Sequence, residues 1–240
     1  MSVFVLKIIA MITMVIDHIG YCFYPNILLL RLIGRIAFPI YAFLIAQGFL
    51  YTKNRNKYFL KVLLMAILSE IPFDMTFFNS YFYLQYQNVL ITFSIVLFSL
   101  ILYEHLKSKG KDAYYAIMVG FLICFISQAD YSIIGPIVIY MYYFSCKNNE
   151  NYKIKPLNVI LIGTTLIIYE MLHAGLSNPN GLLDFVINRG YIYIGVVVAT
   201  MLIIFYNTKL GPKNKIINTI FYLFYPAHII ALYLISLCIK

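Results

Sequence analysis

The sequence contains little charge for its length. Only 11% of the 240 residues are Asp, Glu, Lys or Arg, and 62% are hydrophobic. A soluble domain carries about a quarter charged residues. Too few polar side chains remain to cover a water-facing surface, so the composition excludes an ordinary soluble protein and predicts that lipid solvates most of the chain. In a membrane protein, a net charge of +9 indicates Lys and Arg in the cytoplasmic connections. Nucleic acid is therefore not expected as a partner.

Several residue types and motifs are also scarce. Tryptophan is absent, whereas 23 tyrosines are available for the membrane interfaces. The four cysteines form no C-x-x-C pair and no zinc spacing. There is no H-E-x-x-H motif, no carboxylate cluster with metal-ligand spacing, no G-x-S-x-G motif and no Walker loop. We therefore expect no metal.

Apolar segments are the dominant feature of the chain. Because a bilayer core requires about 20 apolar residues per helix, the sequence predicts nine spans. They are 3–23, 31–51, 57–77, 87–105, 112–129, 131–146, 155–173, 190–206 and 216–239. The fifth and sixth are separated by Asp130 alone, and Gly135-Pro136 interrupts the sixth. These two could also form one broken hairpin.

Basic residues alternate between the connections. Thirteen of the 18 fall in the even-numbered connections, namely Lys53, Arg55, Lys57, Lys61, Lys107, Lys109, Lys111, Lys147, Lys153, Lys155, Lys209, Lys213 and Lys215. The odd-numbered connections hold only Arg31 and Arg189, with Arg35 just inside a helix. Cytoplasmic connections are enriched in Lys and Arg. The pattern predicts one all-α membrane domain over 1–240, with a cytoplasmic N-terminus and an extracytoplasmic C-terminus.

Ionisable residues inside these spans mark function or buried pairing. With the predicted topology, nearly all lie in the outer half of the membrane: Asp17, His18, Arg31, Arg35, Glu70, Asp74, Asp130, Glu170 and His173, with His228 near mid-membrane. Arg31 and Arg35 share a helix face, and so do Glu70 and Asp74.

Two interpretations of this polar group stay open at this point. Two arginines and two carboxylates at matching depth could simply form interhelical ion pairs, or, together with Asp130, they could bind substrate. Asp17 and His18 are adjacent and point about 100° apart on a helix, so another helix should supply the partner that orients His18. For Glu170 and His173 we favour a structural role.

Several motifs resemble the TraX family along essentially the whole chain. They are Leu6–Met11 leading to Val15-Ile16-Asp17-His18-Ile19-Gly20, Arg31–Ile40, Ser69–Asp74, Gln87–Thr92, Asp130-Tyr131 with Gly135, and Phe224-Tyr225-Pro226-Ala227-His228. The named member of that family N-acetylates the amino terminus of F-type conjugative pilin with acetyl-CoA. The resemblance implies an acetyltransferase in the bacterial inner membrane, acting on a peptide or surface-molecule acceptor.

Acyl transfer from a thioester needs a base, an oxyanion donor and cations for the phosphates of coenzyme A. His18 is the favoured base and His228 the second candidate, because an unperturbed imidazole has a pKa near 6.5. Arg31 or Arg35 would supply cations, and Asn88 would stabilise the oxyanion or position the acceptor. For Asp17 we expect a packing or field-tuning role beside the catalytic group.

Acetyl-CoA is cytoplasmic, whereas the polar group is predicted to lie outside. A polar channel would let the pantetheine arm reach outward, with the adenine end held by the basic inner loops. Two other function classes remain: a transporter with an outer polar site, and a non-catalytic partner in pilus or peptide assembly. A transporter would more often show paired broken helices from internal repeats, which this sequence lacks.

Overall fold

A computed structural model describes residues 1–131, 133–177, 182–183, 186–187, 190–212 and 214–239. Arg189 and Lys213, which belong to the charge pattern, and Lys240 at the C-terminus lie outside the described residues. The described chain is helical, apart from one isolated parallel β-bridge between Gln87 and Ala129.

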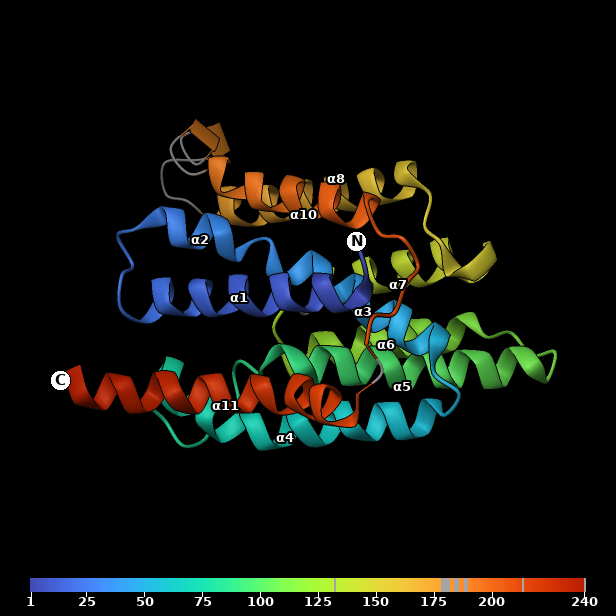
Figure 1. Ribbon diagram of the computed structural model, residues 1–240, viewed down its shortest axis with the longest axis horizontal. Coiled ribbons are helices and arrows are strands. Elements are labelled where there is room, and N and C mark those ends of the chain that lie inside the picture. The colour runs from blue at the N-terminus through green and yellow to red at the C-terminus, as the bar shows by residue number, and fades with distance from the viewer. Residues whose placement is uncertain (132, 178–181, 184–185, 188–189, 213, 240) are drawn as a thin grey trace. The chain divides into compact units, whose positions relative to one another are not determined.

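Helices occupy all nine predicted segments where the structure describes them (Figure 1). They are α1 (Val3–Cys22), α2 (Leu28–Gly34), α3 (Ala37–Tyr51), α4 (Arg55–Phe78), α5 (Val89–Ser108), α6 (Tyr114–Ser127), α7 (Ile134–Lys147), α8 (Pro156–Leu176), α10 (Ile194–Ile204) and α11 (Lys215–Ile239), with 3₁₀ turns η1 (Glu150–Tyr152) and η2 (Gly190–Tyr193). The second predicted span is broken into α2 and α3, and the fifth and sixth form two separate helices, α6 and α7.

Five helical segments are long and apolar enough to cross a membrane: Val3–Cys22, Leu28–Tyr51, Val89–Ser108, Pro156–Leu176 and Thr219–Cys238. Two more, Tyr114–Ser127 and Gly190–Ile204, are apolar but shorter. The outward faces are apolar as well; on α4, for example, Leu64 is 53% and Ile67 59% exposed. Such faces require a lipid solvent, and the protein is a membrane protein.

Local sequence explains where several helices begin and end. The side chains of Ser2, Asn54 and Asn88 accept hydrogen bonds from the first backbone N–H groups of α1, α4 and α5, as N-cap residues do. Pro156 opens α8, where its missing N–H costs nothing. Asn79 ends α4 in the left-handed conformation, with φ 51°.

The chain divides into two compact units, which are described separately. The first comprises Met1–Leu44 and Met141–Pro212. In it α1 packs on α2, and α8 on α10 (Figure 1). Two hydrogen bonds join the N-terminal segment to the connection after α10. Val3 N donates to the Lys209 carbonyl at 2.9 Å, and Asn207 N donates to the Met1 carbonyl at 2.9 Å.

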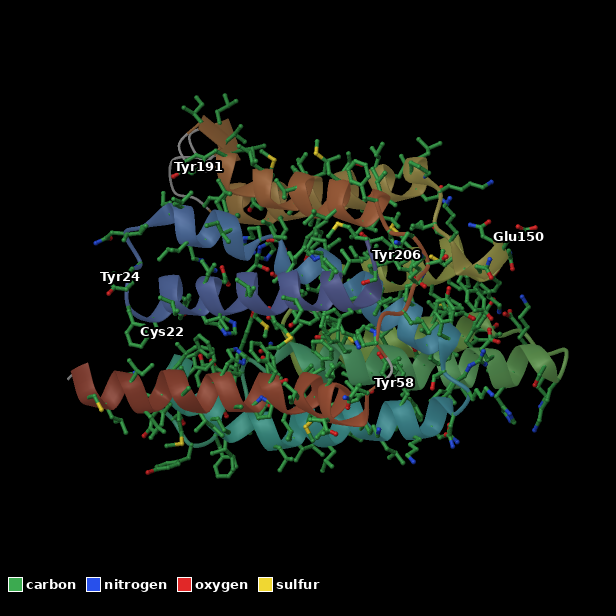
Figure 2. The ribbon with its side chains drawn as sticks, in the orientation of Figure 1. Cys22, Tyr24, Tyr58, Glu150, Tyr191 and Tyr206 are labelled. Carbon is green, nitrogen blue, oxygen red and sulfur yellow. The ribbon has the colours of Figure 1, made fainter. Side chains whose placement is uncertain are left out.

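Aromatic rings fill the core of this first unit. The ring of Phe43 meets Tyr142 edge-on at 5.4 Å and Tyr206, labelled in Figure 2, at 5.2 Å. Tyr142 is fully buried.

The second unit comprises Ile45–Tyr140 and Lys213–Lys240. Here α4 packs between α11 and α5, and α5 also contacts α6. Each of α4 and α11 contains a proline, Pro72 and Pro226. The Thr76 hydroxyl lies 2.7 Å from the Pro72 carbonyl and 3.4 Å from the Ile229 carbonyl. This hydroxyl links the two helices at their proline-containing turns.

Candidate active site

The first ion pair of the first unit joins α1 to α2. Arg31 Nη1 lies 2.8 Å from Asp17 Oδ2 and 3.4 Å from the Asp17 carbonyl oxygen. Gly34 makes this approach possible, because a Cβ at that position would lie 1.9 Å from Asp17 Oδ1. Arg31 also lies over the ring of Tyr21, 5.4 Å from its centroid. These contacts close the α1–α2 hairpin.

A second, looser ion pair joins Arg35 at the end of α2 to Glu170 on α8, with Nη1 3.7 Å from Oε2. The guanidinium also lies over the Tyr193 ring at 5.9 Å. Gly195 of α10 touches the Leu32 carbonyl and Arg35 Cβ so closely that a Cβ would be 2.2 Å from that oxygen. The structural role expected for Glu170 fits this contact.

Each arginine thus has a carboxylate partner within the first unit. The interhelical ion pairs expected from sequence are formed there with Asp17 and Glu170. Glu70 and Asp74 belong to the second unit and are described with it. Each arginine already has a carboxylate beside it, which favours the ion-pair interpretation over phosphate binding.

His18 lies on the same turn of α1 as the Asp17–Arg31 pair and is half-buried. Cys22 and Tyr24, labelled in Figure 2, mark this end of α1, and Tyr24 is exposed. The Asp17 carboxylate is directed to Arg31, as expected if it does not orient His18. The base role of His18 stays a prediction.

In the second unit, Glu70 of α4 contacts Asn88 at the start of α5. Glu70 Oε2 accepts hydrogen bonds from the Asn88 side-chain amide and from its backbone N–H at 3.4 Å. The amide also donates to the Ala66 carbonyl at 3.0 Å, while Oδ1 accepts from Leu90 N at 3.0 Å. Asn88 is fully buried. Both of its amide hydrogens are engaged, so donation to an oxyanion would require one of these bonds to break.

Asp74 lies one turn further along α4 and is 2% exposed. Its Oδ2 accepts a hydrogen bond from Tyr83 N at 2.8 Å. The other oxygen, Oδ1, and Oε1 of Glu70 are buried and have no hydrogen-bond donor among the described residues. Two buried carboxylates thus each keep one oxygen available to a donor.

Asp130 lies in the turn between α6 and α7. Its Oδ1 accepts a hydrogen bond from the Tyr86 hydroxyl, and its carbonyl accepts one from Thr92. Its backbone N–H donates to the Gln87 carbonyl at 2.9 Å. Asp130 therefore joins the α4–α5 connection to the α6–α7 turn, which is a structural use of a residue predicted to bind substrate.

His228 of α11 is 8% exposed and has a defined orientation. Its Nδ1 lies 2.9 Å from the Phe224 carbonyl, and its ring stacks on Phe224 at 5.0 Å. A carbonyl only accepts, so Nδ1 carries the hydrogen, and in the neutral ring Nε2 is the acceptor nitrogen. This hydrogen bond fixes the tautomer that a general base requires.

The predicted residues thus fall into two groups. Asp17, His18, Arg31 and Arg35 belong to the first unit, and Glu70, Asp74, Asn88, Asp130 and His228 belong to the second. Sequence reasoning missed Tyr83 and Tyr86, whose N–H and hydroxyl groups bind Asp74 and Asp130. The sequence feature that could have pointed to them is the tyrosine-rich connection after α4.

The basic connection before α4 forms a shallow hollow of about 410 Å³, lined by Thr52, Lys53, Asn54, Arg55 and Asn56. Arg55 Nη1 also lies 3.4 Å from Glu104 Oε2. The charge of Lys53 and the first N–H groups of α4 make this hollow suited to an anion.

Comparisons with known proteins extend over the same residues. A family model described as TraX protein matches residues 2–236. The chain is 26% identical to probable fimbrial assembly protein FimC, serogroup H1, of Dichelobacter nodosus, over 95% of this chain and 93% of that protein. A segment is 38% identical to uncharacterized protein RP591 of Rickettsia prowazekii (strain Madrid E), over 28% of this chain and 27% of that protein. No solved structure matches the chain.

Proposed function

The chain belongs to the TraX family, and from that premise we propose that it is a membrane-embedded acyltransferase that modifies a pilin-like peptide or a surface molecule. The relative named as a fimbrial assembly protein supports a role in pilin modification or assembly. The main structural support is the presence of imidazoles and carboxylates within apolar helices. Glu70 and Asp74 each have one carboxylate oxygen that accepts no hydrogen bond from the described residues.

The proposed topology has nine spans in the bacterial inner membrane, with the N-terminus inside and the C-terminus outside. Hydrogen bonds within each unit support it. Val3 N donates to the Lys209 carbonyl, so the N-terminus lies beside the eighth connection. In the proposed topology the N-terminus and every even-numbered connection are on the cytoplasmic side, which agrees with this contact. Asp130 N is bonded to the Gln87 carbonyl, which joins the third and fifth connections.

The acyl donor is acetyl-CoA, and the basic hollow before α4 would hold its phosphates. Lys53 and the N-terminus of α4 supply the positive charge there, while Arg55 is paired with Glu104. From Arg55 to Glu70, α4 rises roughly 22 Å at about 1.5 Å per residue. An extended pantetheine arm is of comparable length, so a thioester carried along this helix would arrive near the two carboxylates.

The acceptor amine is proposed to bind at Glu70 and Asp74. An amine or ammonium offers N–H donors to the two carboxylate oxygens that lack them. The buried Asn88 amide holds Glu70 in place, and Tyr83 N holds Asp74. Buried charges are usually paired, and a cationic acceptor would supply that pairing on binding.

His18 is the base proposed from the sequence motif, and His228 is the second candidate, which belongs to the same unit as Glu70 and Asp74. An acceptor that enters as an ammonium first gives one proton to water. The base then takes a proton from the neutral amine or the hydroxyl, whose lone pair attacks the thioester carbonyl carbon. The tetrahedral intermediate then collapses, and the C–S bond breaks. The leaving thiolate takes the proton from the imidazolium, which gives the acetylated acceptor and free coenzyme A. His18 is half-buried, so its ring is the more accessible of the two.

The test is to incubate detergent-purified protein with acetyl-labelled acetyl-CoA and a synthetic apolar peptide that has a free amino terminus. We expect release of coenzyme A and label on the peptide. The same peptide with a formylated amino terminus is the matched control, and it should stay unlabelled if an amine is the acceptor.

Other results would identify the rival classes. If the peptide binds but no coenzyme A is released, the protein is a non-catalytic assembly partner, a class that the fimbrial assembly relative favours. Hydrolysis of acetyl-CoA with no label on any peptide or co-purified molecule would contradict the proposed acceptor.

A further inference from the structure

The connection between α4 and α5, residues 79–88, presents apolar side chains outward. No Asp, Glu, Lys or Arg occurs in it. At its tip Tyr81 is 70%, Phe82 73% and Leu84 83% exposed. These are among the most exposed large apolar side chains of the described structure. Large apolar side chains exposed in this way indicate contact with an apolar environment.

The first half of the connection is held by α4. Asn79 N donates to the Asp74 carbonyl, and Tyr83 N donates to Asp74 Oδ2 at 2.8 Å. The Tyr83 ring stacks on Phe78, with centroids 4.1 Å apart and planes 15° apart. Because the backbone at 79–83 is fixed, Tyr81 and Phe82 are kept from folding back onto the protein.

The second half is held by the turn between α6 and α7. The Tyr86 hydroxyl donates to Asp130, and Gln87 N donates to the Gln128 carbonyl at 3.3 Å. The tip at 81–84 therefore projects between two fixed ends. Because the loop is already ordered, little further conformational entropy is lost when its side chains insert into a membrane.

The helix that leads into this connection, α4, carries a lipid-facing surface of its own. Large side chains on that helix are 44–59% exposed, namely Leu60, Leu64, Ile67, Leu68 and Ile71. The bilayer that covers α4 is therefore the apolar environment at hand where this helix ends and the tip begins. Tyr prefers the interface between acyl chains and headgroups, and the tip has two exposed aromatic rings, Tyr81 and Phe82, and no charge.

We propose that residues 79–88 form an interfacial anchor, with Tyr81, Phe82 and Leu84 inserted at the boundary between headgroups and acyl chains. The anchor binds lipid, not a protein partner. Asp74 receives three hydrogen bonds from this connection, donated by the backbone N–H groups of Asn79, Ser80 and Tyr83, so the anchor also holds Asp74 and Glu70 at a constant depth below the membrane surface. The inference depends on the membrane location and is independent of acyl transfer.

The absence of tryptophan makes a direct test possible. Phe82→Trp gives a protein with a single Trp, which is reconstituted in phosphatidylcholine vesicles brominated either near the head or near the tail of the acyl chains. Ile67→Trp, on the exposed face in the middle of α4, is the mid-membrane control. Asn148→Trp, exposed in a polar connection, is the aqueous control.

Head-proximal bromines should quench Phe82→Trp more strongly than tail-end bromines, whereas Ile67→Trp should show the reverse order and Asn148→Trp no quenching. Emission from Phe82→Trp that matches Asn148→Trp and ignores both lipids would overturn the proposal and leave a protein partner as the occupant. Tyr81→Trp is the second variant if Phe82→Trp does not fold, and it should show the same order of quenching.

Discussion

Removing Arg31 alone should destabilise the protein more than removing Arg31 together with Asp17. The guanidinium contacts both the carboxylate at 2.8 Å and the Asp17 carbonyl. In Arg31→Ala the carboxylate stays partly buried, and its buried Oδ1 already lacks a donor among the described residues. Breaking a buried pair costs about 3–5 kcal/mol. The two side chains remain 24% and 22% exposed, so solvent lowers our expectation to roughly 2–3 kcal/mol.

The double variant should recover part of that loss, because no charge is left unpaired. We expect a coupling energy of about 1–2 kcal/mol between Arg31 and Asp17. Arg35 and Glu170 are the matched comparison. Their N–O distance of 3.7 Å makes the Coulomb attraction about a quarter weaker, and the coupling energy should be correspondingly smaller.

The assay is thermal loss of helical circular dichroism in detergent for the single and double variants of each pair, with acyl transfer measured on the same preparations. Mild, additive effects at both pairs would refute the ion-pair reasoning. If Arg35 instead binds substrate, Arg35→Ala should keep its thermal stability and lose activity.

Three further outcomes follow from the geometry. Gly34→Ala should lower the unfolding midpoint, because its Cβ would meet Asp17, and overpacking of this kind costs about 1–3 kcal/mol. Gly190→Ala is the control: the nearest atom to its Cβ would be 3.5 Å away, so its melt should be unchanged. A topology reporter inserted near Asn56 should be cytoplasmic, and one fused after Lys240 extracytoplasmic; a cytoplasmic C-terminus would contradict the nine-span topology. Asn88→Ala should cost about 1–3 kcal/mol, because it removes the cap of α5 and the side-chain amide that donates to Glu70. An unchanged melt would show that Glu70 finds another donor.

The helical segments could be predicted from sequence because lipid imposes a simple rule. Every spanning segment must be a continuous apolar helix of sufficient length, so hydropathy finds it. The break between α2 and α3 was not predicted, because the run from Leu28 to Tyr51 is apolar except for its two arginines and Gln47. A separate α6 and α7 was one of two alternatives that the sequence left open.

The partners of the polar residues could not be predicted as well. Charge and hydropathy give the depth of Arg31 and Arg35 in the membrane, but not which helices are neighbours. Glu70 and Asp74 were therefore equally plausible partners, although Asp17 and Glu170 lie beside the arginines. Gly34 is the one local signal, since it leaves space for a carboxylate at the α1–α2 contact.

The most direct test of the proposed mechanism is acyl transfer by His18→Ala and His228→Ala, measured beside the wild type as release of coenzyme A and label on the acceptor. We predict that His18→Ala keeps its thermal stability and loses at least about 10²-fold in rate, the usual scale for general-base help. Normal turnover in His18→Ala together with loss in His228→Ala would contradict this and assign the base to α11. Normal turnover in both variants would exclude general-base catalysis by either imidazole.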